Sequence, residues 1–235
     1  MKVVRAFSRF AHEYNKYNVI QKDVAKKLCM LLDKKYYNKV LDVGAGDGVI
    51  YQNMCSQNIK FSNFTALDFS EDMLSVHEDA IFVDKVCLNF NEDKLSTHFN
   101  ANEFSLVISS SALQWSNNLE QLLKDLSLLG GDLLFSFFTA NTFRTLHNTI
   151  NITSPILKQE EIFTALNKVF NYEFEVIEYK LDFASVHEML RYIKKSGVNG
   201  GVKQLSYKEI KFLMLEYPLD YLEFEVILVK VTGRK

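Results

Sequence analysis

The chain has 235 residues, of which 48% are hydrophobic and 24% charged, and its net charge is −2. These values are ordinary for a globular protein, and they exclude a polycation that binds nucleic acid through its overall charge. No run of about 18 apolar residues and no secretory signal is present, so we expect a cytoplasmic protein with no membrane contact. The three cysteines form no CxxC pair and the five histidines lack ligand spacing, so we expect no bound metal.

The first two-thirds of the chain alternates between strand and helix patterns. Apolar residues at helical spacing predict a helix over 21–32, and leucines on one face predict another over 118–126. Four short apolar runs, each bounded by turn residues, predict buried strands at 39–44, 64–70, 104–110 and 130–138. Strands that alternate with helices in this way imply βαβ units and a mostly parallel sheet.

The last third of the chain has a different pattern. Two long stretches with partial alternation, 172–183 and 220–231, fit antiparallel strands. Two helices between them begin at capping boxes, at Ser185 and Ser206, and Gly197 is placed to end the first helix. We therefore expect a single α/β domain over 1–235, a Rossmann-like doubly wound sheet with an antiparallel C-terminal strand. Helical additions are expected to cover the site, as an N-terminal lid over about 1–35 and as insertions at about 140–150 and 185–217.

The segment "KVLDVGAGDG" places three glycines directly after the first predicted strand. In an open parallel sheet, ligands bind beyond the carboxyl ends of the strands, where a glycine turn lets them approach the backbone. A dinucleotide-binding turn would have its third glycine where Val49 stands. The pattern present, Asp42 followed by x-G-x-G-x-G, resembles motif I of the class I S-adenosylmethionine-dependent methyltransferases. S-adenosylmethionine is cationic, so the nearby acids Asp42 and Asp47 would favour its binding. The alternative interpretation of this segment is a strand–turn–helix corner that binds no ligand.

The resemblance assigns further residues to the methyl donor. Asp68 lies 26 positions after Asp42, at the end of the second predicted strand, and would accept bonds from the ribose hydroxyls. The alternative is a loop aspartate that caps the next helix, a role that Ser70 fits equally well. Near 86–93, Asn89 stands where this class often has an acid that meets the adenine amino group. The donor residues implied in this way are Gln21, Asp42, Gly44, Ala45, Gly46, Asp68, Phe69, Asn89, Phe90 and Ser109.

Three more stretches, 7–21, 111–115 and 190–201, narrow the resemblance to the malonyl-acyl-carrier-protein O-methyltransferases of biotin biosynthesis. The residues that carry it are Phe7, Arg9, Ala11, Tyr14, Gln21, Gln114, Trp115 and the stretch Leu190–Gly197. Ser110-Ser111 departs from the Asn-Leu that is frequent in these enzymes. The resemblance implies that the free carboxylate of a malonyl thioester becomes a methyl ester, with S-adenosylhomocysteine as the second product.

A carboxylate is already a nucleophile, so this reaction needs positioning residues and no general base. Tyr14 and Gln21 are two helical turns apart, so they lie on one face of a helix. That helix is expected to close over the donor, and the alternative is that it only packs on the core. Gln114 and Trp115 follow the strand where the acceptor should arrive, and the alternative for Trp115 is a hydrophobic plug. Arg144 is the first candidate for the malonyl carboxylate, because arginine offers a fork of donors. Arg9 and Arg191 are its substitutes.

The stretch 191–211 holds six basic residues and one acid, a local excess of five positive charges in a net-negative chain. This excess predicts docking of an acidic partner, for which acyl carrier protein fits, and the alternative is a set of solvated helix faces.

Two other functions stay open. A related enzyme would methylate a small free acid, as in trans-aconitate-type methylation, and a non-catalytic module would retain only the fold.

Overall fold

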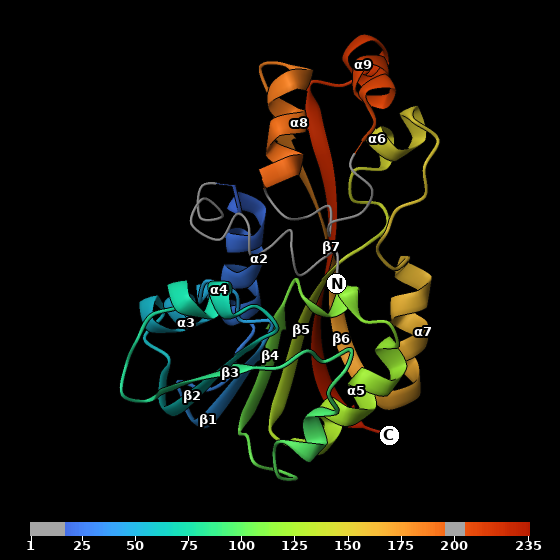
Figure 1. Ribbon diagram of the computed structural model, residues 1–235. Coiled ribbons are helices and arrows are strands. Elements are labelled where there is room, and N and C mark those ends of the chain that lie inside the picture. The colour runs from blue at the N-terminus through green and yellow to red at the C-terminus, as the bar shows by residue number, and fades with distance from the viewer. Residues whose placement is uncertain (1–16, 196–204) are drawn as a thin grey trace.

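The computed structural model describes residues 17–195 and 205–235. Within these residues, seven strands form one sheet in the order β3-β2-β1-β4-β5-β7-β6, with helices on both faces (Figure 1). The first five strands run parallel, and β7 runs antiparallel to both of its neighbours. The prediction of a Rossmann-like, mostly parallel sheet with an antiparallel C-terminal strand is therefore confirmed.

Each βαβ unit places a strand's carboxyl end at the same edge of the sheet. The strands are β1 (Tyr36–Val43), β2 (Lys60–Asp68), β3 (Val83–Cys87), β4 (Leu106–Ser110), β5 (Asp132–Phe138), β6 (Phe170–Asp182) and β7 (Tyr221–Arg234). The helices are α2 (Val19–Met30), α3 (Val49–Ser56), α4 (Glu71–Val76), α5 (Leu119–Leu128), α6 (Arg144–Thr149), α7 (Gln159–Val169), α8 (Val186–Lys195) and α9 (Tyr207–Glu216), with short 3-10 turns η1 (Leu95–Thr97) and η2 (Leu113–Trp115).

Two elements were not anticipated from the sequence. The structure has five strands before the C-terminal pair where four were expected, because β3 is a half-exposed edge strand without a continuous apolar run. The predicted strand at 104–110 is thus the fourth in the chain. Helix α7 was also missed. The predicted capping box at Ser206 is present, since the Ser206 hydroxyl accepts from the Glu209 N–H and the Glu209 carboxylate accepts from the Ser206 N–H. Gly197, which was predicted to end the first of the two helices, lies outside the described residues.

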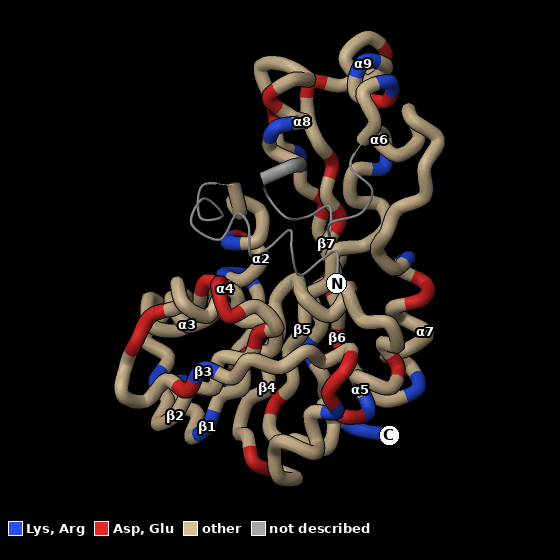
Figure 2. The backbone as a smooth tube through the Cα atoms, in the orientation of Figure 1, with Lys and Arg blue, Asp and Glu red and all other residues tan. Residues whose placement is uncertain are grey.

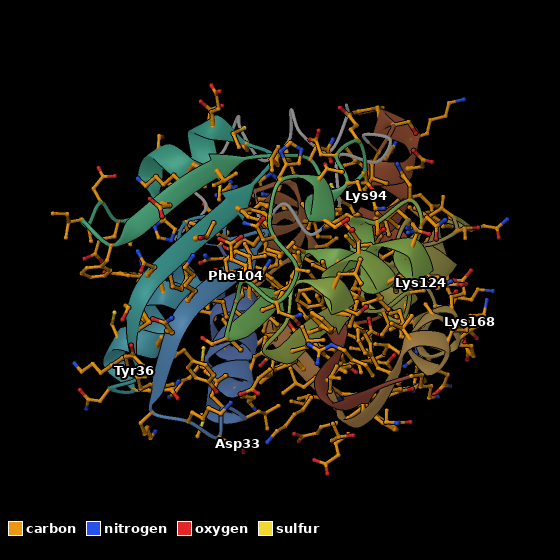
Figure 3. All side chains as sticks on the ribbon, turned by 90° about the horizontal axis from the view of Figure 1, so that it is seen from below. Asp33, Tyr36, Lys94, Phe104, Lys124 and Lys168 are labelled. Carbon is orange, nitrogen blue, oxygen red and sulfur yellow. The ribbon has the colours of Figure 1, made fainter. Side chains whose placement is uncertain are left out.

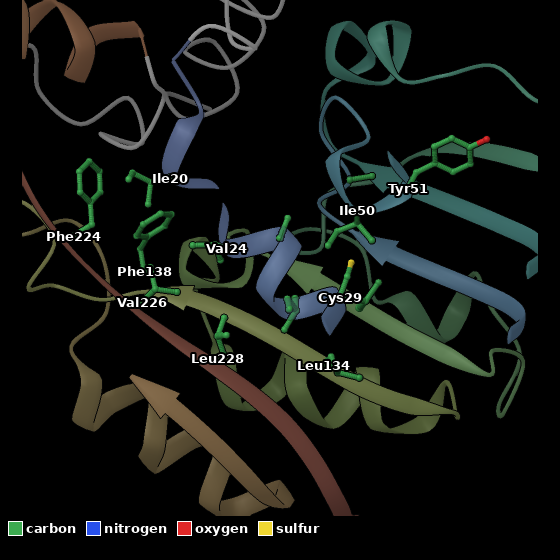
Figure 4. Packing of buried hydrophobic residues seen from close by; sticks show 14 of the residues in the cluster. Ile20, Val24, Cys29, Ile50, Tyr51, Leu134, Phe138, Phe224, Val226 and Leu228 are labelled. Carbon is green, nitrogen blue, oxygen red and sulfur yellow. The ribbon is translucent and has the colours of Figure 1, made fainter. Parts of the chain in front are cut away.

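Apolar side chains cover both faces of the sheet, because neighbouring strand residues point to opposite faces. On one face, Val24 of α2 is fully buried against residues of β5 and β7 (Figure 4). On the other face, leucines of α5 and α7 pack against the side chains of β5 and β7 that point to that face. At the surface of that layer, Glu120 pairs with Lys124 at 2.6 Å and with Lys168 of α7 at 2.7 Å (Figure 3).

The predicted helical additions lie at one end of the molecule. Helix α9 contacts both α6 and α8, beyond the carboxyl edge of the sheet (Figure 1). Helix α2 is the described part of the predicted N-terminal lid, and it packs on α3 and on the sheet. None of the described helices is long and apolar enough to cross a membrane.

Candidate active site

A pocket of about 210 Å³ opens at the carboxyl ends of β1, β2 and β4. Its walls come from four segments that the chain brings together: 44–47 after β1, 67–69 at the end of β2, 89–92 after β3 and 110–112 after β4. Asn18 and Gln21 of the α2 region and Trp115 of η2 also line it, as do Val49, Met73 and Asn117. This is the edge where open α/β sheets bind their ligands.

The three glycines of the turn are needed for two different reasons. All have positive φ, between 57° and 84°. A Cβ on Gly44 would lie 2.2 Å from the Ala112 Cβ, and one on Gly48 would lie 2.8 Å from the His77 ring. A Cβ on Gly46 would meet only Met73, at 3.5 Å, and Gly46 lines the pocket. Only Gly46 thus leaves its space to a ligand, whereas Gly44 and Gly48 make room for protein atoms.

Asp68 lines the pocket with its carboxylate held by backbone. One oxygen accepts from the Gly46 N–H at 3.0 Å and the other from the Ser70 N–H at 2.9 Å. The capping role that competed for Asp68 belongs to Ser70, whose hydroxyl accepts from the Met73 N–H at the start of α4. Burial raises the pKa of Asp68 to about 6, although the backbone N–H groups favour its charged form. The side chain is therefore a fixed acceptor facing the ligand space.

The charges around the pocket are of one sign. The described residues that line it include Asp47, Asp68 and Glu92 but no lysine, arginine or histidine. Behind them, Asp42 is 1% exposed and neither of its carboxyl oxygens has a hydrogen-bond partner. Burial, then the neighbouring Asp68 and Asp47, raise the pKa of Asp42 well above its ordinary value. Such surroundings suit a cationic ligand and disfavour a pyrophosphate, so they fit the ammonium and sulfonium of S-adenosylmethionine.

Nine of the residues predicted for the site lie in the wall of this pocket. They are Gln21, Gly44, Ala45, Gly46, Asp68, Phe69, Asn89, Phe90 and Trp115. The amide oxygen of Asn89 already accepts from the Asn91 N–H at 3.1 Å, which leaves its second lone pair for a ligand. The pocket therefore gathers residues that are far apart in the chain.

Three predicted residues lie directly behind the wall. Asp42 is in β1, and the Ser109 hydroxyl donates to the Val43 carbonyl at 2.6 Å. Gln114 is 4% exposed, and its amide donates to the Ser111 carbonyl at 2.7 Å. Ser111 itself lines the pocket with a left-handed φ of 58°, which is uncommon for a residue other than glycine. Gln114 thus acts on the pocket through the backbone of Ser111.

Two asparagines of the pocket, Asn18 and Asn91, were not found from the sequence. The Asn18 amide donates to the Asp47 carboxylate at 3.1 Å and ties the start of α2 to the glycine turn. The Asn91 amide donates to the Trp115 carbonyl at 3.1 Å, and its oxygen accepts from the Asn117 N–H at 2.7 Å. Asn91 thereby fixes the segment that carries Trp115. No local motif marks either asparagine, because both partners are distant in sequence.

The remaining acceptor candidates lie elsewhere. Tyr14 and Arg9 are outside the described residues. Arg144 is exposed at the start of α6 and lines a second pocket, which shares no residue with the first. Arg191 is exposed on α8. Residues 17–195 and 205–235 contain no group of three or more histidine, cysteine or acidic side chains suited to a metal ion.

The strand order, the glycine turn after β1 and the acid at the tip of β2 define the class I methyltransferases. A family model described as "Methyltransferase domain" matches residues 41–128. A solved methyltransferase structure from Bacillus halodurans shares the fold, with a TM-score of 0.63, 17% identity, and coverage of 91% of this chain and 99% of that chain.

Curated relatives extend the likeness to most of the chain. The malonyl-[acyl-carrier protein] O-methyltransferase of Acetivibrio thermocellus is 30% identical, over 84% of this chain and 78% of that protein. Malonyl-[acyl-carrier protein] O-methyltransferase 2 of Ilyobacter polytropus is 28% identical, over 92% of this chain and 87% of that protein. The chain therefore belongs to the family of S-adenosylmethionine-dependent O-methyltransferases that includes these enzymes.

Proposed function

We propose that this enzyme methylates the free carboxylate of a malonyl thioester carried by acyl carrier protein, and so begins pimeloyl and biotin synthesis. The observation that carries the proposal is the likeness over most of the chain to enzymes bearing that name, at up to 30% identity. The likeness is not confined to the donor half of the fold, because it continues well beyond residue 128, where the family model ends.

The chemistry of the methyl donor agrees with a carboxylate acceptor. S-adenosylmethionine, when bound, supplies a methyl group on a positively charged sulfur. A carboxylate oxygen forms the new bond to the methyl carbon, the carbon–sulfur bond breaks, and its electron pair stays on sulfur. No proton moves, so no general base is required of the chain. Carboxylate and sulfonium neutralise each other in this step, so a buried pocket that excludes water favours it.

The task of the protein is then to hold both reactants in line. Asp68, Phe69, Asn89 and Phe90 are our candidates for holding the nucleoside, with the Gly46 backbone beneath it. We place Trp115 at the acceptor side of the pocket, with Gln114 as a positioning residue behind Ser111. Correct alignment of this kind is worth an effective molarity of about 10⁵–10⁸ M in model reactions.

Carrier protein docking is proposed for the stretch 191–211. Of its basic residues, Arg191, Lys208 and Lys211 have described side chains, and Figure 2 shows acidic residues on α8 and α9 as well. Helix α9 also exposes large apolar side chains, with Tyr207 at 80% and Leu215 at 72%. Exposed apolar groups beside lysines are typical of surfaces that bind an acidic protein partner.

The test is mass spectrometry of malonyl-carrier protein incubated with the enzyme and S-adenosylmethionine. We expect the mass of the malonyl-carrier protein to rise by the increment for one methylation. No increase is expected for acetyl-carrier protein, which has no free carboxylate. If free malonate or malonyl-CoA turns over as fast as the carrier, the acceptor is a small acid. If S-adenosylhomocysteine releases no heat on titration into the protein, the chain is a binding module without donor affinity.

A further inference from the structure

A second pocket, of about 670 Å³, lies beyond the carboxyl end of β5. Helix α6, the segment 152–158 and the first turn of α7 enclose it. Its volume is within the usual range for small-molecule sites. Side-chain amides and hydroxyls line it together with two cations, Arg144 and Lys158, and two acids, Glu160 and Glu161. This pocket has no part in the donor site described above.

Two buried polar atoms of this pocket have no partner in the protein. His147 is 6% exposed, and its Nδ1 has no hydrogen-bond partner. The Ser154 hydroxyl is likewise buried without a partner. Burial lowers the pKa of His147, so its ring is neutral at pH 7 and offers one donor and one acceptor. Buried polar atoms are costly unless they are hydrogen-bonded, so a polar ligand would stabilise both.

Arg144 lines the same pocket and is exposed. Among the described residues it has no ion-pair or hydrogen-bond partner for its guanidinium. The segment before it is held firmly: Phe143 has a left-handed φ of 59°, is 3% exposed and donates its N–H to the Glu223 carbonyl at 2.8 Å. The buried Glu225 carboxylate accepts from Thr139 at 2.6 Å and from the Asn141 amide at 3.0 Å. A cation on so rigid a support is placed for an anion.

The two pockets lie at the same edge of the sheet. The first includes Ser110, which pairs with Ser136 of β5, and the second begins at Ala140. The four positions from Ser136 to Ala140 span at most about 13 Å, so the two pockets lie near each other at this edge. The first pocket has no cation among its described lining residues, and the reacting carboxylate must lie there, beside the methyl group. Arg144 is therefore available to a different anion of the same acceptor.

We propose that the second pocket binds the phosphopantetheine arm of the acceptor, with Arg144 on the arm's phosphate and His147 and Ser154 on its amide groups. This rests on the proposed function, because that acceptor carries such an arm. The arm joins a phosphate to a thioester through a polar chain with two amides, so one molecule would occupy both pockets. Arg144 could bind either the malonyl carboxylate or the phosphate, because both are oxyanions. The experiment below distinguishes these two contacts.

The experiment measures binding to the full-length protein saturated with S-adenosylhomocysteine, with three probes. 4′-Phosphopantetheine has the phosphate and no carboxylate, malonyl-pantetheine has the carboxylate and no phosphate, and pantetheine has neither. We expect the phosphate to improve affinity about tenfold over pantetheine, the effect of one hydrogen-bonded charge pair, and Arg144→Gln to remove that advantage. The matched control is Lys60→Gln, which removes an exposed cation at the start of β2, outside both pockets and outside the stretch 191–211, and which should retain it.

Two further results would decide the matter. If Arg144→Gln weakens malonyl-pantetheine and leaves 4′-phosphopantetheine unchanged, Arg144 binds the malonyl carboxylate and the proposal is wrong. If the wild-type protein binds pantetheine and its phosphate equally, the second pocket has no phosphate site. Because these are binding measurements, they are independent of methyl transfer. Absent turnover of malonyl-carrier protein, with the arm still bound, would instead overturn the proposed acceptor.

Discussion

The donor half of the molecule, β1 to α5, and the half that follows it, from β5 to β7, form their sites in different ways. In the donor half, backbone at the strand ends forms the pocket, and Asp68 is held by two backbone N–H groups. In the second half, side chains of inserted helices and loops form the pocket, with Arg144 and His147 on a six-residue helix. The charges differ as well, since the described lining of the first pocket holds acids and no cation, whereas that of the second holds Arg144 and Lys158 beside Glu160 and Glu161.

This contrast separates the two parts of the function. A site made of backbone requires glycines and acids at fixed spacing, so many enzymes with different acceptors can share it. A site made of inserted side chains is free to change with the acceptor. The family model accordingly matches 41–128, the region of the backbone-built site, and stops before β5. The predictions below test whether the donor half behaves as a backbone-built, acid-lined site.

The largest effect is expected for Gly44→Ala. The new Cβ would lie 2.2 Å from the Ala112 Cβ at a backbone φ of 79°, so both overpacking and strain oppose it. We expect the free energy of unfolding to fall by about 2–4 kcal/mol, measured by urea denaturation. Gly46→Ala is the matched variant, because its Cβ has room beside Met73, and it should reduce donor affinity more than stability. Equal losses of stability in the two variants would contradict the separation of their roles.

These glycines also show which features of the site can be predicted from the sequence. Their spacing, together with Asp42 and Asp68, predicted the turn and the edge of the sheet where the pocket lies, because both depend on local backbone geometry. Other lining residues, such as Asn89 and Trp115, were predicted from the resemblance to the methyltransferases. The spacing did not show that Gly44 and Gly48 make room for Ala112 and His77, since those contacts arise only when distant segments meet.

The acceptor side was less predictable for the same reason. The sequence indicated helical insertions but not where their side chains lie. Arg144, the first candidate for the malonyl carboxylate, lines a second pocket, and that role stays a prediction. The link from Asn91 to Trp115 joins residues 24 positions apart. Edge strand β3 was missed because it lacks an apolar run.

Asp68→Ala tests the donor contact directly. Removal of a charged acceptor should weaken S-adenosylhomocysteine binding by about 1.5–3 kcal/mol, measured by calorimetry. Asp72→Ala, an exposed acid on the adjacent α4, is the control and should leave the affinity unchanged. Unchanged affinity in the Asp68 variant would remove this carboxylate from the donor site.

Asp42→Asn tests the acid behind the turn. The folded-state pKa of Asp42 is raised, so the folded protein holds its proton more tightly than the unfolded chain, and stability falls as pH rises above about 4. The amide cannot ionise and avoids this loss. We expect the variant to be more stable than the wild type by about 1–3 kcal/mol at pH 8, with the difference vanishing near pH 4. A less stable variant at pH 8 would show that the ionised Asp42 is favourable in the folded protein.

The smallest effect is the pH dependence of donor affinity. Ribose hydroxyls donate to the charged form of Asp68, whose pKa of about 6 in the free protein lies within reach of ordinary buffers. Affinity for S-adenosylhomocysteine should therefore fall by about fivefold between pH 6 and pH 5, while Asp68→Asn stays flat and accounts for titration of the ligand itself. The stability of the free protein changes in the opposite direction, because a raised carboxyl pKa makes the folded state more stable as pH falls from 6 toward 4. A parallel fall of both quantities over this range would mean that unfolding, and not the protonation of Asp68, causes the loss of affinity.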